Sequence, residues 1–440
     1  MASEQTKASF LPQALPRLKD AQLPVLVHAA GERGCGWVCA DKEEQDDATN
    51  DVPPGLPHVS RLGVSAVESA IRLVFGKESD VKAAVFHGVN QPLTVEDIDI
   101  GTPMAREIIV RTAASGVCHS DLHFVEGLWP FPPPAVLGHE AAGVVEEVGE
   151  QVTYVKPGDH VIACLSVFCG HCEQCLTGHP NRCFSPETRR APDDPPRLSQ
   201  NGQPVNQFIN ISSFAEKMLL HENAVVKIRE DVPLEAAALI GCGVMTGVGA
   251  ALNTARVEPG STVAVFGAGG VGLAAIQGSR IAGARMIIAV DISESKLATA
   301  RELGATHIVD ASSGDPVTRI REMTNGGADY AFEAIGLKAV AAQAFECLNV
   351  GGTATVIGMI PIGEKVEIDA RMLLSERKLQ GSIMGSNRFR VDMPRYIDFY
   401  LQGRLKLDEM ITRKGHLEDV NEAFRAMKAG EVARTVLTFN

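Results

Sequence analysis

The chain has 440 residues, 45% of them hydrophobic and 22% charged, and carries a formal net charge of −13. This composition can fill the cores of two ordinary domains, and the acidic balance argues against a nucleic-acid partner because phosphate binding needs basic patches. We find no run of about 18 apolar residues, so the sequence predicts no membrane span.

Residues 1–80 differ from the rest of the chain because they combine acidic and proline-rich stretches, as in residues 41–47 and 51–55. Such a composition predicts a disordered extension, with one short helix where apolar residues recur at helical spacing over 65–75. A second interpretation is that Val81 is the true start in a bacterial gene, since a valine codon can be read as methionine there. Under both interpretations the extension is expected to supply no ligand and to pack little against the core.

Short alternating or β-branched runs begin after the extension and predict a mostly β domain that continues to about residue 239. Strands are expected at 81–86, 107–113 and 141–148, with turn residues at 157–159. The polar, proline-rich stretch 191–210 is expected to be a surface loop.

The second half alternates predicted strands with predicted helices, which indicates a parallel sheet covered by helices on both faces. The strands are expected at 263–266, 286–290, 306–309, 330–333 and 353–357, and the helices at 271–282 and 296–303. Helical periodicity returns at 396–400 and 417–427, before a last strand at 435–439. The sequence therefore predicts the α/β class, with a doubly wound sheet beside the mostly β domain.

Four cysteines crowd into one loop with the spacing of zinc ligands: Cys169, Cys172, Cys175 and Cys183. Four thiolates complete a tetrahedron, which is typical of a structural zinc, whereas iron–sulfur or haem binding fits less well. Metal sites are favoured over disulfides because the chain is large and shows no signal-peptide pattern, so the cytoplasm is the expected location. The remaining cysteines match no ligand pattern and are expected to be unreactive or buried: Cys35, Cys39, Cys164 and Cys347.

A second group of possible ligands is spread along the chain: Cys118, His139, Glu140 and Cys242. Two thiolates and one imidazole would leave a fourth position on a zinc ion for water or substrate, as in a catalytic site. Plain burial of the cysteines and a hydrogen-bonded core histidine explain the same residues. Spacing alone leaves both interpretations open.

Three glycines, Gly267, Gly269 and Gly272, lie between a predicted strand and a predicted helix. The first allows a tight turn, the second lets the backbone approach a pyrophosphate, and the third lets helix and strand pack closely. Asp291, 24 residues after Gly267, ends the next strand, where its carboxylate can accept hydrogen bonds from ribose hydroxyls. The same carboxylate would repel a 2′-phosphate, so NAD is favoured over NADP.

These motifs occur in one order together with the segments 116–121, 138–140, 158–161 and 241–243. In that order they resemble the zinc-containing medium-chain alcohol dehydrogenase family, in its long-loop branch, similar to class III-like enzymes and bacterial aryl or primary alcohol dehydrogenases. The resemblance covers about 81–440. It implies a GroES-like, mostly β catalytic domain formed by 81–243 and 386–440, and a Rossmann dinucleotide-binding domain over 244–385.

The resemblance also implies roles for single residues. Cys118, His139 and Cys242 match the catalytic zinc ligands, Glu140 matches a carboxylate behind the zinc, and Asp121 matches the carboxylate that orients His139. Ser120 is similar to the hydroxyl that bonds the substrate alcohol, and His123 to the histidine that passes the proton to solvent through the cofactor ribose. His119, Lys296 and Arg434 are similar to cofactor-binding residues, and the expected substrate pocket holds Trp129, Phe131 and Leu165.

By this resemblance the protein is expected to be an NAD-dependent enzyme with one catalytic and one structural zinc. It would interconvert primary or aromatic alcohols and aldehydes by hydride transfer from a zinc-bound alkoxide. One alternative is glutathione-dependent formaldehyde dehydrogenase, which is weakened because no obvious arginine is placed to hold a glutathione carboxylate. Another is an enzyme that keeps NAD permanently bound, and the least favoured is a catalytically silent relative, since the ligands and proton-relay residues are all present.

The expected partners are a small-molecule alcohol or aldehyde and further copies of the chain. The resemblance implies a homodimer or a higher homo-oligomer. Exposed strand edges near 357–359 and 378–384 are the expected contacts between copies.

Overall fold

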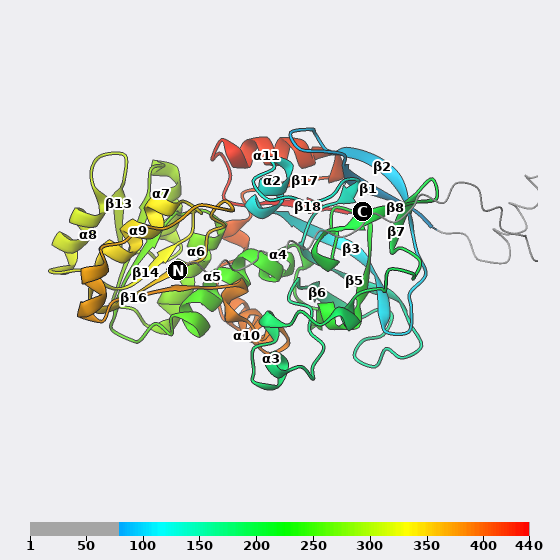
Figure 1. Ribbon diagram of the computed structural model, residues 1–440, viewed down its shortest axis with the longest axis horizontal. Helices are drawn as coiled ribbons and strands as arrows, with labels where there is room; N and C mark the ends of the chain where they lie inside the picture. The colour runs from blue at the N-terminus through cyan, green and yellow to red at the C-terminus, as the bar shows by residue number, and fades with distance from the viewer. Residues whose placement is uncertain (1–78, 440) are drawn as a thin grey trace, which may run out of the picture. The chain divides into compact units, whose positions relative to one another are not determined.

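The computed structural model describes residues 79–439 (Figure 1). The predicted extension and its short helix at 65–75 lie outside the described residues, apart from Ser79 and Asp80, which begin strand β1 (Ser79–Phe86). The described part contains a mostly β portion and a parallel sheet covered by helices (Figure 1).

The mostly β portion contains a closed barrel and a larger sheet. The barrel follows the order β1-β2-β7-β8-β4, and the sheet follows the order β10-β6-β5-β3-β18-β17, with β9 also paired to β3. Strand β3 (Glu107–Val117) is largely buried because it pairs with β5 (Glu140–Val148), β9 (Lys217–His221) and β18 (Thr435–Thr438). The last strand of the chain therefore returns to the sheet formed by the first half. The other strands are β2 (Thr94–Ile100), β4 (Ala135–Val136), β6 (His160–Ala163), β7 (Leu198–Gln200), β8 (Gln203–Gln207), β10 (Val225–Lys227) and β17 (Arg413–Gly415).

The second sheet is parallel throughout, in the order β13-β12-β11-β14-β15-β16. Its first strand, β11 (Thr262–Phe266), is completely buried, as expected for a continuous apolar run in a covered sheet. The other strands are β12 (Met286–Asp291), β13 (His307–Asp310), β14 (Ala328–Glu333), β15 (Leu348–Val356) and β16 (Lys378–Gly381). The connecting helices are α6 (Gly270–Ala282), α7 (Glu294–Glu302), α8 (Pro316–Thr324) and α9 (Lys338–Glu346). The predicted α/β class with a doubly wound sheet is confirmed.

A continuous helical segment over Leu234–Thr254 is long and apolar enough to cross a membrane, so the expectation that the chain has no such run is wrong. Its most apolar window is 89% buried inside the protein, and its central turn packs against α6. The segment is therefore explained as a core helix of this fold. It consists of α4 (Leu234–Leu239), the π-helical turn η5 (Ile240–Val244), α5 (Met245–Gly249) and the π-helical turn η6 (Ala250–Thr254).

The remaining helices lie in the mostly β portion and at the C-terminal end. They are α2 (His119–Val125), α3 (Glu173–Leu176), α10 (Phe389–Leu401) and α11 (Val420–Lys428). Short 3₁₀ helices are η1 (Pro180–Arg182), η2 (Pro186–Thr188), η3 (Phe208–Asn210), η4 (Glu222–Ala224), η7 (Ala370–Ser375), η8 (Met384–Ser386), η9 (Asp408–Met410) and η10 (Leu417–Asp419).

The prediction of a surface loop over 191–210 is wrong. Strands β7 and β8 form a hairpin there, and Phe208, which begins η3, is completely buried. Arg197 of this region and Arg190, which directly precedes the region, pair with the buried carboxylate of Glu107 at 2.7 and 2.5 Å. Arg197 therefore satisfies a buried partner that is distant in the sequence, which a local pattern does not reveal.

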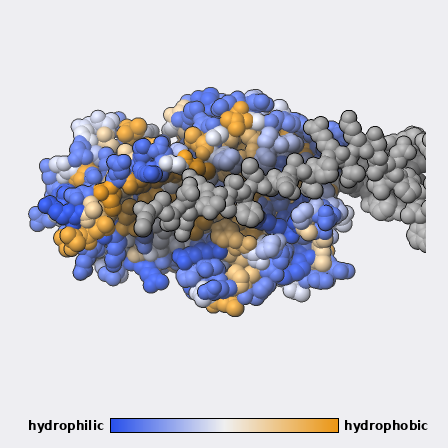
Figure 2. Space-filling model, in the orientation of Figure 1, coloured by the Kyte–Doolittle hydropathy of each residue, from blue (hydrophilic) through white to orange (hydrophobic). Residues whose placement is uncertain are grey.

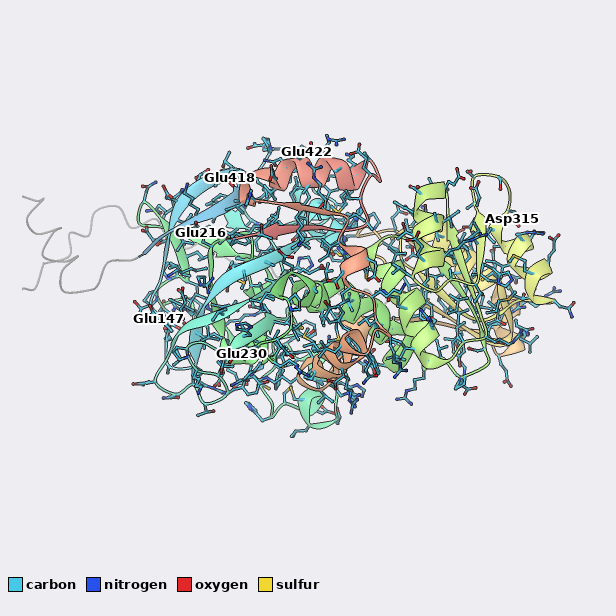
Figure 3. The ribbon with its side chains drawn as sticks, turned by 180° about the vertical axis from the view of Figure 1, so that it is seen from behind. Glu147, Glu216, Glu230, Asp315, Glu418 and Glu422 are labelled. Carbon is cyan, nitrogen blue, oxygen red and sulfur yellow. The ribbon has the colours of Figure 1, made fainter. Side chains whose placement is uncertain are left out.

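The surface differs between regions. Figure 3 shows six labelled carboxylates at the outside of the molecule, spread over both portions: Glu147, Glu216, Glu230, Asp315, Glu418 and Glu422. Figure 2 shows a mostly hydrophilic face interrupted by apolar patches, several of them over the parallel-sheet portion.

The expected strand at 357–359 is not formed, because β15 ends at Val356.

Candidate active site

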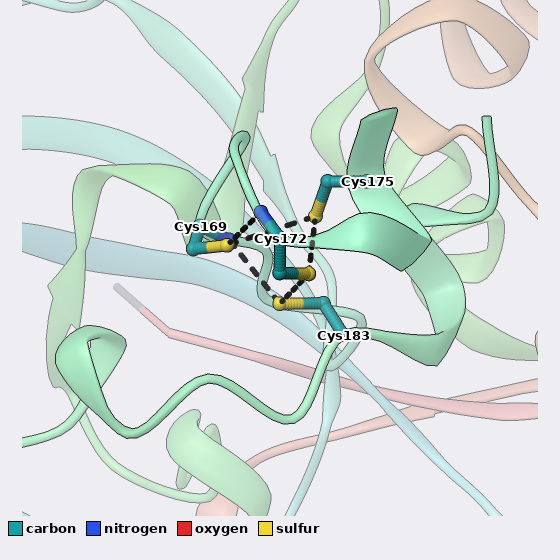
Figure 4. A group of neighbouring side chains, drawn as sticks. All are labelled: Cys169, Cys172, Cys175 and Cys183. Atoms are coloured by element: carbon teal, nitrogen blue, oxygen red, sulfur yellow. Dashed lines mark hydrogen bonds between the residues drawn. The ribbon is translucent and has the colours of Figure 1, made fainter. Parts of the chain in front are cut away.

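The four-cysteine loop folds into a compact sulfur cluster (Figure 4). Neighbouring Sγ atoms are 3.5 Å apart between Cys172 and Cys175, 3.8 Å between Cys172 and Cys183, and 3.9 Å between Cys169 and Cys175. A tetrahedral zinc with Zn–S bonds near 2.3 Å holds its sulfur atoms about 3.8 Å apart. The backbone N–H groups of Cys169 and Cys172 also donate to sulfur atoms of the cluster, each at 3.3 Å. The sulfur spacing therefore fits a structural zinc.

Three further ligand side chains meet although they come from distant elements. Cys118 caps the N-terminus of α2, His139 directly precedes β5, and Cys242 lies in the π-helical turn η5. The Nε2 atom of His139 is 3.1 Å from Sγ of Cys242, and the three ligand atoms lie within 4.8 Å of one another. All three residues are buried. The donor set fits a zinc ion with three protein ligands and one open position.

Asp121 fixes the orientation of the histidine. Its Oδ1 atom accepts hydrogen bonds from Nδ1 of His139 at 2.9 Å and from the N–H of Gly138 at 3.2 Å, while Oδ2 accepts the N–H of Cys118 at 3.3 Å. Burial alone would lower the pKa of His139, but Asp121 and Cys118 together raise that pKa well above its ordinary value. Because Nδ1 is bound to the carboxylate, Nε2 is the nitrogen that faces the sulfur atoms and would bind a metal.

Glu140 and Arg434 form a buried pair behind this cluster. Oε2 of Glu140 lies 3.6 Å from Nη2 of Arg434 and accepts the N–H of Gly243 at 3.1 Å. Burial raises the pKa of Glu140 to about 7, although the positive charge of Arg434 acts in the opposite direction. Oε1 of Glu140 has no hydrogen-bond partner within residues 79–439, so this carboxylate keeps one oxygen free beside the ligands.

Two residues of helix α2 carry the expected proton-transfer groups. The Oγ atom of Ser120 is 3.7 Å from Sγ of Cys118. His123 lies one turn further, and its Nδ1 atom is buried with no hydrogen-bond partner in the described part of the chain. Burial lowers the pKa of His123, so its ring is neutral near pH 7 and can accept a proton.

The three residues expected in the substrate pocket each contact a different part of the structure. Phe131 joins an aromatic cluster, because its ring centroid is 5.2 Å from that of Phe208, whose own centroid is 6.0 Å from that of His139. Leu165 packs against the hydrophobic core that contains Cys118 and Cys242. Trp129 donates its backbone N–H to the carbonyl of His123 at 3.4 Å, and its buried Nε1 has no partner among the described residues.

The sequence patterns do not predict Phe208 as part of the site. It lies in the stretch interpreted as a surface loop, yet its ring packs edge-on against that of a ligand histidine. The signal that could have revealed it is the aromatic residue itself, since a phenylalanine in an otherwise polar stretch is usually buried.

The glycine-rich turn follows β11 and opens helix α6. Gly267 adopts a φ of 94°, which favours glycine, and a side chain at Gly272 would collide with the carbonyl oxygen of Gly267. A Cβ atom at Gly269 would meet no atom within 4 Å. The third glycine thus permits close packing of helix and strand, while the second faces open space at a helix N-terminus, where a phosphate fits.

Asp291 ends strand β12 beside this turn. Its Oδ2 atom accepts the N–H of Ala268 at 2.8 Å, and Oδ1 accepts the N–H groups of Ile292 and Ser293 at 2.8 and 3.0 Å. The carboxylate therefore holds the glycine-rich turn.

Arg434 connects the metal cluster to the glycine-rich turn. Side chains added at Gly243, next to the ligand Cys242, or at Gly270, in the glycine-rich turn, would both collide with its guanidinium group. Its Nε atom is buried and has no acceptor within the described residues, as expected if a cofactor phosphate supplies one. Burial lowers the pKa of His119, although Cys118 acts in the opposite direction, and the nearby positive charges of Arg434, His123 and Lys296 lower it further. The three expected cofactor residues therefore lie in one region. The residues present fit a dinucleotide.

Two family models match the chain. Residues 104–230 match the alcohol dehydrogenase GroES-like domain, and residues 270–402 match the zinc-binding dehydrogenase domain. An alcohol dehydrogenase zinc-binding domain protein from Burkholderia ambifaria is 39% identical, with 82% of this chain and 99% of that chain covered and a TM-score of 0.78.

Two other solved structures cover 82% of this chain and all of their own. Benzyl alcohol dehydrogenase from Acinetobacter calcoaceticus is 34% identical with a TM-score of 0.78, and a zinc-binding dehydrogenase from Sinorhizobium meliloti 1021 bound to NADP is 28% identical with a TM-score of 0.70. The predicted GroES-like and Rossmann portions and the predicted family are confirmed. This chain belongs to the zinc-containing medium-chain alcohol dehydrogenase family, and it is an oxidoreductase of a kind that uses zinc and a nicotinamide cofactor.

Proposed function

We propose that the protein is an NAD-dependent dehydrogenase that interconverts primary or aromatic alcohols and their aldehydes. The observation that carries this proposal is the position of Arg434, which reaches from the cysteine–histidine cluster to the glycine-rich turn. A metal site and a glycine-rich turn that share one side chain support hydride transfer between a zinc-bound substrate and a dinucleotide. We assign 81–243 and 386–440 to the catalytic domain and 244–385 to the dinucleotide domain.

The residues act in a definite order. Cys118, His139 and Cys242 would hold the catalytic zinc. Arg434 and His119 would hold the dinucleotide pyrophosphate, and Lys296 would also bind the cofactor. When bound, zinc supplies a Lewis acid that acidifies the alcohol hydroxyl, and NAD supplies the acceptor for the hydride. Ser120 accepts the hydroxyl proton, and His123, neutral because burial lowers its pKa, carries that proton toward solvent. The alcohol thus loses one proton and one hydride and becomes the aldehyde.

The aromatic surroundings of the site support an aromatic or other bulky alcohol. Phe124, Phe131 and Phe208 form edge-to-face pairs with centroids 4.8 to 6.0 Å apart, and Phe208 reaches the ring of His139. The similar benzyl alcohol dehydrogenase acts on an alcohol of this kind by its name. Aromatic rings favour such contacts by about 0.5–1.5 kcal/mol for each pair.

A substrate panel tests the proposal. Purified protein is assayed with benzyl alcohol, ethanol and S-hydroxymethylglutathione, each with added NAD and with added NADP. We expect turnover of benzyl alcohol with NAD. Turnover only of the glutathione adduct would replace the proposal by formaldehyde oxidation, and NAD released only on denaturation would show that the cofactor is permanently bound.

Metal analysis tests the zinc assignments separately. We expect two zinc ions per chain in freshly purified protein. Cys118→Ser should lose one zinc and all turnover while keeping its fold, whereas Cys172→Ser should lose the other zinc and lower the midpoint of thermal unfolding. One zinc or none in the unaltered protein would contradict the assignment.

A further inference from the structure

The parallel sheet reverses its strand order between β11 and β14, since β12 and β13 lie on one side of β11, and β14, β15 and β16 lie on the other. In open α/β sheets, ligands bind in the crevice outside the carboxyl ends of the strands at this reversal. One wall of the crevice is the glycine-rich turn after β11. The other wall begins at Glu333, the last residue of β14, which lies opposite Phe266 of β11.

Glu333 is a fully buried carboxylate that binds the turn following it. Its Oε1 atom accepts the N–H groups of Ile335 at 2.9 Å, Gly336 at 2.6 Å and Leu337 at 3.4 Å. Burial raises the pKa of Glu333, although these N–H groups act in the opposite direction. Its Oε2 atom is buried with no hydrogen-bond partner in the part of the chain that the structure describes. Such a buried acid is costly, so its place here indicates that the shape of this turn matters.

The turn held by Glu333 touches the glycine-rich turn directly. A Cβ atom at Gly267 would lie 2.6 Å from Cγ1 of Ile335. Gly336 adopts a φ of 94°, and a Cβ atom there would lie 2.7 Å from the carbonyl oxygen of Met359. A Cβ atom at Gly358 would lie 2.6 Å from Oε2 of Glu333. The two walls are therefore packed with little room for adjustment, and a shift of one would move the other.

We propose that Glu333 is a positioning residue for the dinucleotide: by holding the turn 334–337 it sets the second wall of the crevice and thereby the affinity for the cofactor. This inference rests on the proposed NAD-dependent function. Because Glu333 acts through the turn, it should affect cofactor binding and leave the metal cluster unchanged.

The test compares three variants of the full chain. Glu333→Ala removes the acceptor, Glu333→Gln keeps an amide oxygen that can accept the same N–H groups, and Asp329→Ala is the matched control. Asp329 lies at the other end of the same strand, where its Oδ2 atom accepts the N–H of Thr262 at 2.8 Å. Each is measured for its NAD dissociation constant, its KM for NAD and for alcohol, its zinc content and its unfolding midpoint.

We expect Glu333→Ala to raise the dissociation constant and the KM for NAD about tenfold, the scale of a lost hydrogen-bonded arrangement, with zinc content and the KM for alcohol unchanged. Glu333→Gln should restore most of the affinity. Asp329→Ala should lower the unfolding midpoint without weakening NAD. A Glu333→Ala protein that binds NAD as well as the unaltered protein, or an equal loss in Asp329→Ala, would overturn the inference.

A second measurement covers the case in which Glu333→Ala does not fold. In the unaltered protein without NAD, the amide hydrogens of Ile335, Gly336 and Leu337 should exchange slowly, because the buried carboxylate holds them. Rapid exchange would overturn the inference. An unaltered protein that binds neither NAD nor NADP would defeat the proposed function itself, and the inference with it.

Discussion

Ser120 is the residue on which the proposed proton transfer depends. It follows the ligand Cys118 by two positions, and its Oγ atom is 3.7 Å from that sulfur. Ser120→Ala should lower kcat by roughly two to four orders of magnitude, the usual effect of a positioned proton-transfer group, while alanine preserves helix α2. His123→Gln should cost less, since water can replace the relay. Steady-state kinetics at pH 7 with zinc analysis checks this, and a near-normal rate for Ser120→Ala would rule out the relay.

Asp291 is the residue expected to choose between NAD and NADP. In the structure Asp291 has a second role, because its Oδ2 atom also accepts the N–H of Ala268 in the glycine-rich turn. Asp291→Gly should weaken NAD by losing the ribose hydrogen bonds and should relieve repulsion of NADP, but it would also loosen the turn.

Asp291→Asn is the matched control, since its amide oxygen can keep the bond to Ala268 while the negative charge is gone. We expect Asp291→Asn to raise the KM for NAD less than Asp291→Gly does, and to raise the kcat/KM for NADP. If the unaltered protein already uses both cofactors equally, the carboxylate is not aimed at the ribose.

At this scale the sequence predicted the residues whose chemistry is fixed by type and spacing. The four-cysteine loop is local, so its cluster could be predicted without the fold. Cys118, His139 and Cys242 required the family resemblance, because their meeting depends on three distant elements. Phe208 and Glu333 were not predicted, since each is defined by what packs around it.

At the scale of elements, the segment 191–210, which was predicted to be a loop, is held by a buried cluster of charged side chains: Glu107, Arg190 and Arg197. Burial disfavours the charged form of Glu107, but Arg190 and Arg197 outweigh that effect and lower its pKa. A lowered pKa in the folded state stabilises the protein at pH values above the unfolded pKa of about 4.3, and this stabilisation is lost as pH falls through the folded pKa.

Glu107→Gln should therefore lower the free energy of unfolding at pH 7 by about 3 kcal/mol, because two guanidinium groups lose a buried partner. The difference from the unaltered protein should shrink below pH 4. Urea unfolding at both pH values measures this. Glu146→Gln breaks exposed pairs to Lys217 and Arg111, and its side chain is 30% exposed, so it should cost less than about 1 kcal/mol. Equal losses in the two variants would contradict the assignment.

Elements were predicted well where periodicity and turn residues agree. The strand–turn–helix over β11 and α6 matches its prediction within a residue at each end, because a buried apolar run, a glycine turn and an apolar helix follow in order. The hairpin of β7 and β8 was missed because its strands have only three and five residues, too short for alternation to be visible.

At the scale of the whole molecule, the parallel sheet ends in an edge strand that the described residues leave unpaired on one side. Strand β16 pairs only with β15 among the described residues. Two exposed apolar side chains lie near it in the sequence: Leu374, before the strand, is 86% exposed, and Ile383, after the strand, is 51% exposed. An uncovered edge with apolar neighbours favours pairing with a second copy, and a two-fold axis would place the same patch on both chains.

We therefore predict a homodimer or a higher oligomer built on this edge. Light scattering at micromolar concentration should give a mass of at least twice the 46.9 kDa of one chain. Ile383→Asp should shift the protein toward monomer, because a charge on each chain would be buried in the contact. Leu401→Asp is the matched control, since Leu401 is 44% exposed at the end of α10 and does not lie on this edge. A stable monomer of the unaltered chain, or equal dissociation in the two variants, would show that the β16 edge is not the contact.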